Sequence, residues 1–181
     1  MTGDPLPTAE KTGAHRPILG LKLLAFGIVV VGAGADLLSK AWMVRLLTMQ
    51  PDSAGPFGRI ELIPGFLALE GAYNPGVTFG LFGGQTDGIM LFTLLATVAL
   101  LVWLLATRRH SVLLHVALGM VLAGAVGNLW DRWHWSKVRD FVLVYVGEHE
   151  WPNFNLADSM IVVGVILLLT LELFGRRHVP G

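Results

Sequence analysis

Four apolar stretches, each long enough to cross a lipid bilayer, dominate this chain of 181 residues. A membrane-spanning helix needs about 20 mostly apolar residues. Hydropathy predicts such helices at about residues 18–38, 89–106, 112–131 and 156–174. Only 14% of the residues are charged, against about 25% in ordinary soluble domains. The sequence therefore predicts an all-α membrane protein with four transmembrane helices.

The composition excludes several classes of function. The 13 basic residues balance the 13 acidic ones, so a strongly basic nucleic-acid-binding surface is not expected. The chain has no cysteine, which excludes disulfides, thiolate metal sites and cysteine nucleophiles. His115, His134 and His149 have no second ligand at metal-binding spacing. We therefore predict no metal and no cofactor.

The distribution of basic residues predicts the orientation in the membrane. The tails and the turn after the second helix carry Lys11, Arg16, Lys22, Arg108, Arg109, Arg176 and Arg177, and short basic segments favour the cytoplasm. We expect one four-helix domain over 17–176, a disordered cytoplasmic tail at 1–16 and a cytoplasmic tail at 177–181. An alternative takes the first apolar stretch, with its Ala33-Gly34-Ala35 end, as a cleavable signal peptide, which would leave three spans.

Two longer segments on the opposite side are expected to form a small extracytoplasmic, β-rich cradle. Alternating apolar and polar residues predict strands at Arg59–Ile63 and Phe141–Val146. The apolar and basic stretch Trp42–Leu47 predicts an interfacial amphipathic segment.

The third predicted helix carries a stripe of small residues. Gly119, Ala123 and Gly127 recur at intervals of four, so they share one face of the helix. Such a stripe lets another helix pack closely, and it carries no chemistry of its own.

Polar side chains gather near the non-cytoplasmic ends of the predicted helices, where burial in lipid is unfavourable. They are Asp36, Lys40, Asn128, Asp131, Arg132, Asn155 and Asp158. Asp36 and Lys40 are one helical turn apart and can form an ion pair, which would be interfacial or functional. Arg132 can form a bidentate pair with a neighbouring carboxylate.

Asp158 lies inside an otherwise apolar helix and needs a partner. Asp140 follows the third helix by a short loop and can fold back to the same level. Two carboxylates in a poorly solvated site cannot both ionise easily, so one keeps a proton, as in aspartic proteases. From spacing alone, a proton or ion pathway and a helix-locking hydrogen bond remain open alternatives.

Five ordered motifs make the chain similar to the bacterial lipoprotein signal peptidases, the signal peptidase II family. The motifs are Asp36–Lys40, Asn74–Gly80, Gly127–Arg132, Val138–Phe141 and Phe154–Ser159. The resemblance implies an aspartyl endopeptidase of the bacterial inner membrane with both termini cytoplasmic and its active site toward the extracytoplasmic face. It would cut diacylglyceryl-modified prolipoproteins on the N-terminal side of the lipidated cysteine. Its partners would be these substrates and membrane lipid, and a monomer is expected.

The resemblance also assigns roles to individual residues. It implies that Asp140 and Asp158 form the catalytic pair. Site-lining residues would be Asn74, Gly76, Asn128, Arg132 and Asn155, with Asp36, Lys40 and Asp131 in support. Because Asp36 and Lys40 belong to a motif, the resemblance weighs against the signal-peptide interpretation.

Two departures from the family pattern leave alternatives open. Thr78 stands where the family usually has Ala, and Ser136 stands where it usually has Gly, a change that matters if this position needs positive φ. One alternative is an altered member that binds lipidated peptides without cutting them. Another is a small proton-coupled transporter, which is disfavoured because the acids cluster at one interface.

Overall fold

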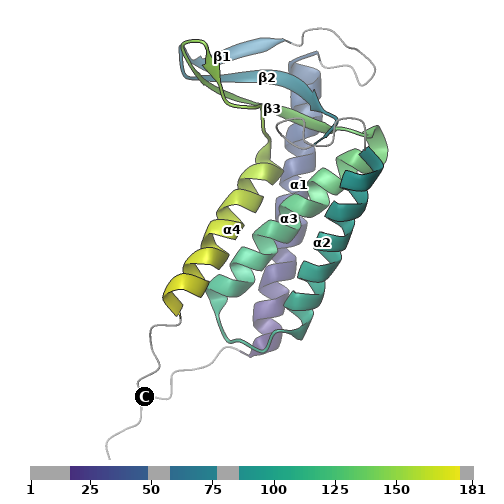
Figure 1. Cartoon of the computed structure of the whole chain (residues 1–181), viewed down its shortest axis with the longest axis vertical. Coiled ribbons are helices and arrows are strands. Elements are labelled where there is room, and N and C mark those ends of the chain that lie inside the picture. Colours follow the sequence, from purple (N-terminus) through teal and green to yellow (C-terminus); the bar gives the residue numbers. More distant parts are fainter. Residues whose placement is uncertain (1–16, 49–57, 77–85, 176–181) are drawn as a thin grey trace, which may run out of the picture.

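The computed structural model describes residues 17–48, 58–76 and 86–175. Four long helices lie together, and a small antiparallel sheet covers one end of them (Figure 1). This arrangement confirms the predicted four-helix membrane fold with a β-rich cradle. The predicted tails at 1–16 and 177–181 lie outside the described residues, as does Thr78.

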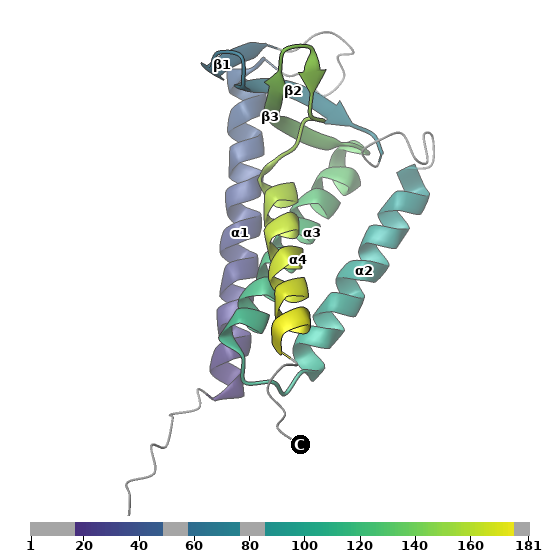
Figure 2. The same ribbon diagram turned by 60° about the vertical axis from the view of Figure 1, so that its left-hand side comes forward.

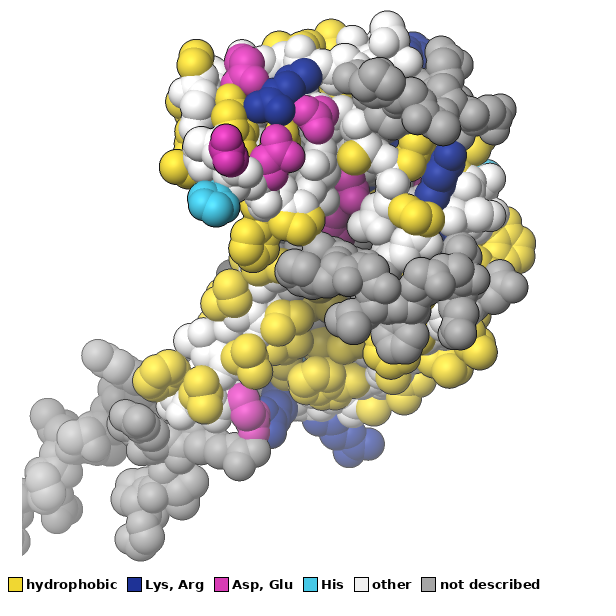
Figure 3. Space-filling model, turned by 45° about the horizontal axis from the view of Figure 1, so that its top comes forward, with side chains coloured by type: hydrophobic (Ala, Val, Ile, Leu, Met, Phe, Trp, Pro, Cys, Tyr) yellow, Lys and Arg dark blue, Asp and Glu magenta, His cyan; other side chains and the backbone are white. Residues whose placement is uncertain are grey.

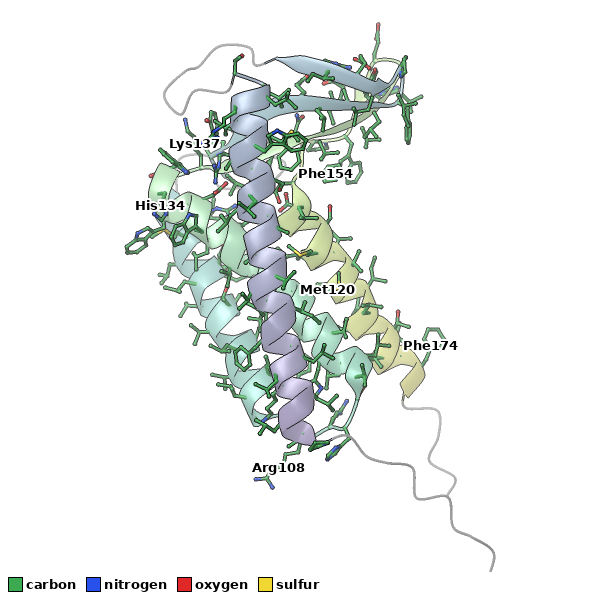
Figure 4. All side chains as sticks on the ribbon, turned by 180° about the vertical axis from the view of Figure 1, so that it is seen from behind. Arg108, Met120, His134, Lys137, Phe154 and Phe174 are labelled. Carbon is green, nitrogen blue, oxygen red and sulfur yellow. The ribbon has the colours of Figure 1, made fainter. Side chains whose placement is uncertain are left out.

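The helices alternate in direction along the bundle. They are α1 (Ile18–Leu46), α2 (Thr86–Ala106), α3 (Val112–Trp135) and α4 (Leu156–Gly175). Each contains a stretch long and apolar enough to cross a membrane. Arg108 and Phe174 lie at one end of the bundle, and His134 and Lys137 lie at the other, beside the sheet (Figure 4). The start of α1 and the end of α4 therefore share the end away from the sheet (Figure 1).

Helix α3 is the central helix. In its apolar window 67% of residues are buried, against 11–17% in the other three helices. The predicted stripe of small residues packs against α1: a Cβ on Gly119 would lie 3.0 Å from the Ala25 carbonyl oxygen, and one on Gly127 would lie 2.3 Å from an Asp36 oxygen. On a neighbouring face, a Cβ on Gly124 would lie 2.3 Å from a backbone oxygen of α4. Small residues therefore let both outer helices approach α3 closely.

Helix α1 continues to Leu46, well beyond the expected end near residue 38. The segment expected to lie along the headgroups is thus mostly the last part of this helix. The helix continues because Lys40 is buried among partners inside the fold. Beyond it, Met43 and Leu47 pack against Phe141 of the sheet.

The sheet has the strand order β1-β2-β3-β4, and neighbouring strands are antiparallel. The strands are β1 (Arg59–Ile63), β2 (Leu67–Asn74), β3 (Val138–Val146) and β4 (His149–Glu150). The strand predicted at Arg59–Ile63 is confirmed, and β3 includes the predicted Phe141–Val146. Strand β2 was not predicted, because its register shifts between Leu69 and Ala72 and breaks the alternation.

Charged side chains gather on the sheet, whereas apolar side chains cover the helices below it (Figure 3). The Arg59 guanidinium lies 4.4 Å from the centre of the Tyr145 ring. It also pairs with Glu61 at 2.7 Å and with Glu70 at 3.1 Å. Hydrogen bonds from Tyr145 and Arg59 lower the pKa of the Glu61 carboxyl. This surface suits water, and the helix surfaces suit lipid.

Candidate active site

The first turn of α4 is fastened to the sheet and capped by its own side chains. Phe154 and Val142 of β3 exchange backbone hydrogen bonds of 3.1 and 2.9 Å. The Asn155 side-chain oxygen accepts from the Asp158 backbone N–H at 2.9 Å, and Asp158 Oδ2 accepts from the Asn155 backbone N–H at 3.1 Å. This reciprocal cap satisfies two donors at the start of the helix. The attachment to β3 brings Asn155 beside Asp140.

Asn155 connects the two aspartates predicted to form a pair. Its side-chain Nδ2 donates to Asp140 Oδ1 at 2.7 Å, and its remaining groups form the cap with Asp158. Asp140 is only 1% exposed, whereas Asp158 is half-buried and lines a pocket. The structure therefore brings both aspartates to one amide residue and leaves Asp158 the more accessible of the two.

Asn128 of α3 links Asp158 to a buried cation. Its Nδ2 donates to Asp158 Oδ1 at 2.7 Å, and its Oδ1 accepts from Lys40 Nζ at 3.0 Å and from Asn155 Nδ2 at 3.2 Å. Because an ammonium group can only donate, Lys40 requires the amide oxygen on its side. The Asn128 N–H₂ group is consequently directed at Asp158.

Lys40 is part of a fully buried charge cluster. Its Nζ lies 2.7 Å from Asp36 Oδ2 and 3.6 Å from Asp131 Oδ2, and all three side chains are inaccessible to solvent. Asp36 Oδ1 also accepts from the Ala157 backbone N–H at 2.9 Å. This cluster joins α1 and α3 to the first turn of α4.

Arg139 forms with Asp131 the bidentate ion pair that was expected of Arg132. The sequence motifs did not single out Arg139. Its Nη2 lies 2.6 Å from Asp131 Oδ1, and its Nε lies 3.1 Å from Asp131 Oδ2. Strand alternation was the available signal, because Arg139 directly precedes Asp140 and must point to the opposite face of β3. Arg132 instead lines the pocket, where its Nη1 donates a 3.5 Å hydrogen bond to the Asn128 carbonyl oxygen. Its buried Nε has no hydrogen-bond partner within the described chain.

Strand β2 carries Asn74 and Gly76 to the same place. In the register between β2 and β3, Ala72 pairs with Asp140 and Asn74 pairs with Val138. Asn74 is therefore a diagonal neighbour of Asp140 on one face of the sheet, close enough to hydrogen-bond its carboxyl. Its Oδ1 accepts from the Gly76 backbone N–H at 3.1 Å. The rest of this motif, residues 77–80, lies outside the described chain.

Asp140 has an unusual electrostatic environment. Burial raises the pKa of its carboxyl to about 7, and the negative charge of Asp158 adds to the rise. Hydrogen bonds from Asn74 and Asn155 and the charge of Lys40 oppose the rise in this pKa without cancelling it. A carboxyl with this pKa is about half protonated at neutral pH.

A pocket of about 390 Å³ opens beside Asp158. Its polar end is formed by Asn74, Asn128, Arg132 and Asp158, and its other walls come from α2, α3 and α4. Helix α2 leans away from α4 toward the sheet end of the bundle (Figure 2). Within the described residues, no three His, Asp or Glu side chains are grouped to hold a metal ion. The pocket can bring an extended chain and a water molecule to the Asp158 carboxyl, which Asn155 links to Asp140.

Comparisons with known proteins agree with this arrangement. A family model described as signal peptidase (SPase) II matches residues 28–174. A lipoprotein signal peptidase of Ectopseudomonas mendocina is 44% identical over 93% of this chain and 94% of its own length. One of Methylocella silvestris is 35% identical over 86% of this chain and 89% of its own length. A solved bacterial membrane enzyme, determined by the in meso method at 2.3 Å, superposes with a TM-score of 0.71 at 26% identity, covering 90% of this chain and 95% of that one.

Proposed function

The chain belongs to the signal peptidase II family, a family of bacterial multi-pass membrane peptidases, and on that premise we propose its substrate, cleavage site and orientation. The substrate is a diacylglyceryl-modified prolipoprotein, cut on the N-terminal side of the lipidated cysteine. Both termini are cytoplasmic, since the short basic segments favour that side. The polar end of the pocket then faces the extracytoplasmic leaflet, where lipidated substrates and water meet.

The observation that carries the proposal is that Asn155 contacts both carboxyl groups. Its side-chain amide donates to Asp140, and its backbone N–H donates to Asp158. We assign the shared proton to Asp140, because its burial raises its pKa to about 7. We assign the ionised role to Asp158, whose carboxyl accepts hydrogen bonds from the Asn128 side chain and the Asn155 backbone N–H. Asp158 also lines the pocket, where water can reach it.

These assignments define an aspartyl mechanism. Asp158 accepts a proton from water while the water oxygen attacks the scissile carbonyl carbon, and Asp140 donates its proton to the carbonyl oxygen. The resulting tetrahedral diol breaks its C–N bond. The leaving nitrogen takes the proton held by Asp158, and a hydroxyl proton returns to Asp140. The signal peptide leaves with a new carboxyl group, and the lipidated cysteine gains a free amino group.

Arg132 supplies a donor for the substrate backbone. It lies at the polar end of the pocket, and its Nε is buried without a hydrogen-bond partner among the described residues. A guanidinium has five N–H donors and no acceptor, so a substrate carbonyl oxygen is its natural ligand. We therefore assign Arg132 to orient the peptide, together with Asn74, which lines the same pocket.

The test is a cleavage assay on the purified protein. A lipobox peptide carrying a diacylglyceryl cysteine is incubated with the protein in detergent, alongside the same peptide without lipid. We expect mass spectrometry to find a product that begins at the lipidated cysteine, and only from the lipidated peptide. Binding of the lipidated peptide without cleavage would indicate the altered family member and contradict the proposal. Proton flux in proteoliposomes with no cleavage would indicate the transporter and contradict it as well.

A further inference from the structure

The pocket continues from its polar end into an apolar arm between α2, α3 and α4. Thr93, Ala96, Thr97 and Leu100 form the α2 wall of this arm. The Thr93 hydroxyl donates to the Ile89 carbonyl oxygen at 2.8 Å, and the Thr97 hydroxyl donates to the Thr93 carbonyl oxygen at 2.7 Å. Because both hydroxyl protons are used within the helix, this wall suits a hydrocarbon occupant.

Leu100 of α2 and Val121 of α3 are the lining residues farthest along their helices from the polar end. Leu100 also packs against the buried cluster that holds α2 to α3, formed by Ala25, Leu104, Leu114, Leu118 and Leu122. Along α3, lining residues run from Arg132 at the polar end to Val121. At a rise of 1.5 Å per residue, that stretch of helix is about 16 Å long. The lining of the arm therefore ends at Leu100 and Val121.

The pocket is narrow along its length. Spread over about 16 Å, the pocket volume of about 390 Å³ gives a mean cross-section of about 24 Å². This area corresponds to a width of about 5.5 Å, which is about half the diameter of a helix with its side chains. This width suits one extended hydrocarbon chain better than the apolar helix of a signal peptide.

We propose that the arm holds one acyl chain of the diacylglyceryl group on the substrate, and that Leu100 and Val121 limit the chain length it accepts. The inference rests on the proposed function, because the arm is continuous with the polar end at Asp158, where the lipidated cysteine is held. The helix of the signal peptide lies outside the pocket, against the lipid-facing surface of the bundle.

Photolabelling tests which part of the substrate occupies the arm. One lipobox peptide carries a diazirine near the methyl end of a palmitoyl chain, a second carries it in the apolar segment of the signal peptide, and a third probe is phosphatidylglycerol with the same labelled chain. We expect the first probe to label residues 96–100 and 121–125, and unlabelled lipopeptide to displace the phosphatidylglycerol probe from them. Labelling of these residues by the second probe, or lipid labelling that lipopeptide does not displace, would overturn the inference.

A pair of matched substitutions tests the length limit. Ala96→Leu fills the arm, whereas Ala99→Leu makes the same change at an exposed position of α2. For a dipalmitoyl substrate we expect Ala96→Leu to raise KM about tenfold, the effect of about two methylene groups losing their burial. For a dioctanoyl substrate we expect a change below about twofold, and Ala99→Leu should leave both values unaltered, since its side chain faces lipid.

The two proposals fail in different ways. If Ala96→Leu raised KM equally for both chain lengths, or for neither, the length limit would be wrong while cleavage itself still stood. If the wild-type protein cleaved no lipidated peptide of either length, the proposed function would be wrong. A melting curve of each variant separates loss of the fold from a blocked arm.

Discussion

The side-chain amide of Asn155 lies 2.7 Å from Asp140 Oδ1, at the residue that also caps α4. One residue thus has two tasks. Its oxygen accepts the first-turn N–H of Asp158, and its nitrogen donates to the buried carboxyl. The start of a membrane helix and the candidate catalytic pair consequently share a single positioning element.

Replacing Asn155 with serine separates these two tasks. Serine is also a good N-cap residue, but its short hydroxyl cannot reach Asp140. We expect Asn155→Ser to be more stable than Asn155→Ala, because it keeps the cap. It should lose about 10- to 100-fold in cleavage rate, the loss typical when a residue that orients a site group is removed. Asn155→Ala should also lose about 1 kcal/mol of stability. A serine variant with the full cleavage rate would show that the Asp140 contact is dispensable.

Removing the buried cation should destabilise the bundle. Lys40→Met leaves Asp36 buried without its partner, whereas Asp131 keeps Arg139. Breaking a buried ion pair in this way destabilises by about 3–5 kcal/mol. The double variant Lys40→Met, Asp36→Asn should recover most of that loss, because a neutral amide keeps an acceptor for the Ala157 N–H. Thermal unfolding in detergent measures both, and a double variant no more stable than Lys40→Met would contradict this explanation.

Ser136 holds a backbone conformation that favours glycine. Its φ of 55° and ψ of 13° are left-handed, at the end of α3. The structure therefore requires a positive φ at this position. This is the condition under which serine in place of the family's usual glycine matters. We expect Ser136→Gly to stabilise the protein by about 1 kcal/mol, since glycine adopts this conformation without strain. Gly147→Ser, at a φ of 61°, should lower the melting temperature instead. Equal melting temperatures for Ser136→Gly and wild type would show that the Ser136 backbone is not strained.

The pH dependence follows from the raised pKa of Asp140. The ordinary value is 3.8 and the folded value is about 7, so the folded state holds a proton that the unfolded state releases. This contribution to stability is full below about pH 4 and is lost as the pH rises through about 7. The asparagine side chain of Asp140→Asn does not titrate. The melting temperature of this variant, taken relative to the wild type, should therefore rise between about pH 4 and about pH 7. Cleavage by the wild type should fall about tenfold per pH unit above 7, as the pair loses its shared proton.

Much of the fold could be predicted because the bilayer imposes strict length and polarity requirements. The four spans are uninterrupted apolar runs in the sequence, and the stripe of small residues on α3 indicates a close helix contact. The stripe could not reveal that α1 is its partner, since that depends on tertiary packing. The polar Asp36 and Lys40 suggested that the first helix ended there, although their burial by α3 allows the helix to continue to Leu46.

The candidate site was predictable as a set of residues but not as a geometry. The order of the motifs predicts that Asp140 and Asp158 form a pair. The Asn155-x-x-Asp158 pattern before an apolar run indicates a helix N-cap. The pairing of Arg139 with Asp131 was missed because it depends on the strand face that β3 presents to α3. The pocket walls on α2 were also missed, because Thr93 and Thr97 resemble any small residues of a membrane helix.

The most direct test of the central claim is single-turnover cleavage of a diacylglyceryl lipobox peptide by Asp140→Asn and Asp158→Asn. Each substitution keeps the size of the side chain and removes a carboxyl group that the mechanism requires. We expect neither variant to form product while both bind the peptide and unfold cooperatively. Cleavage by either variant at the wild-type rate would contradict the aspartyl pair.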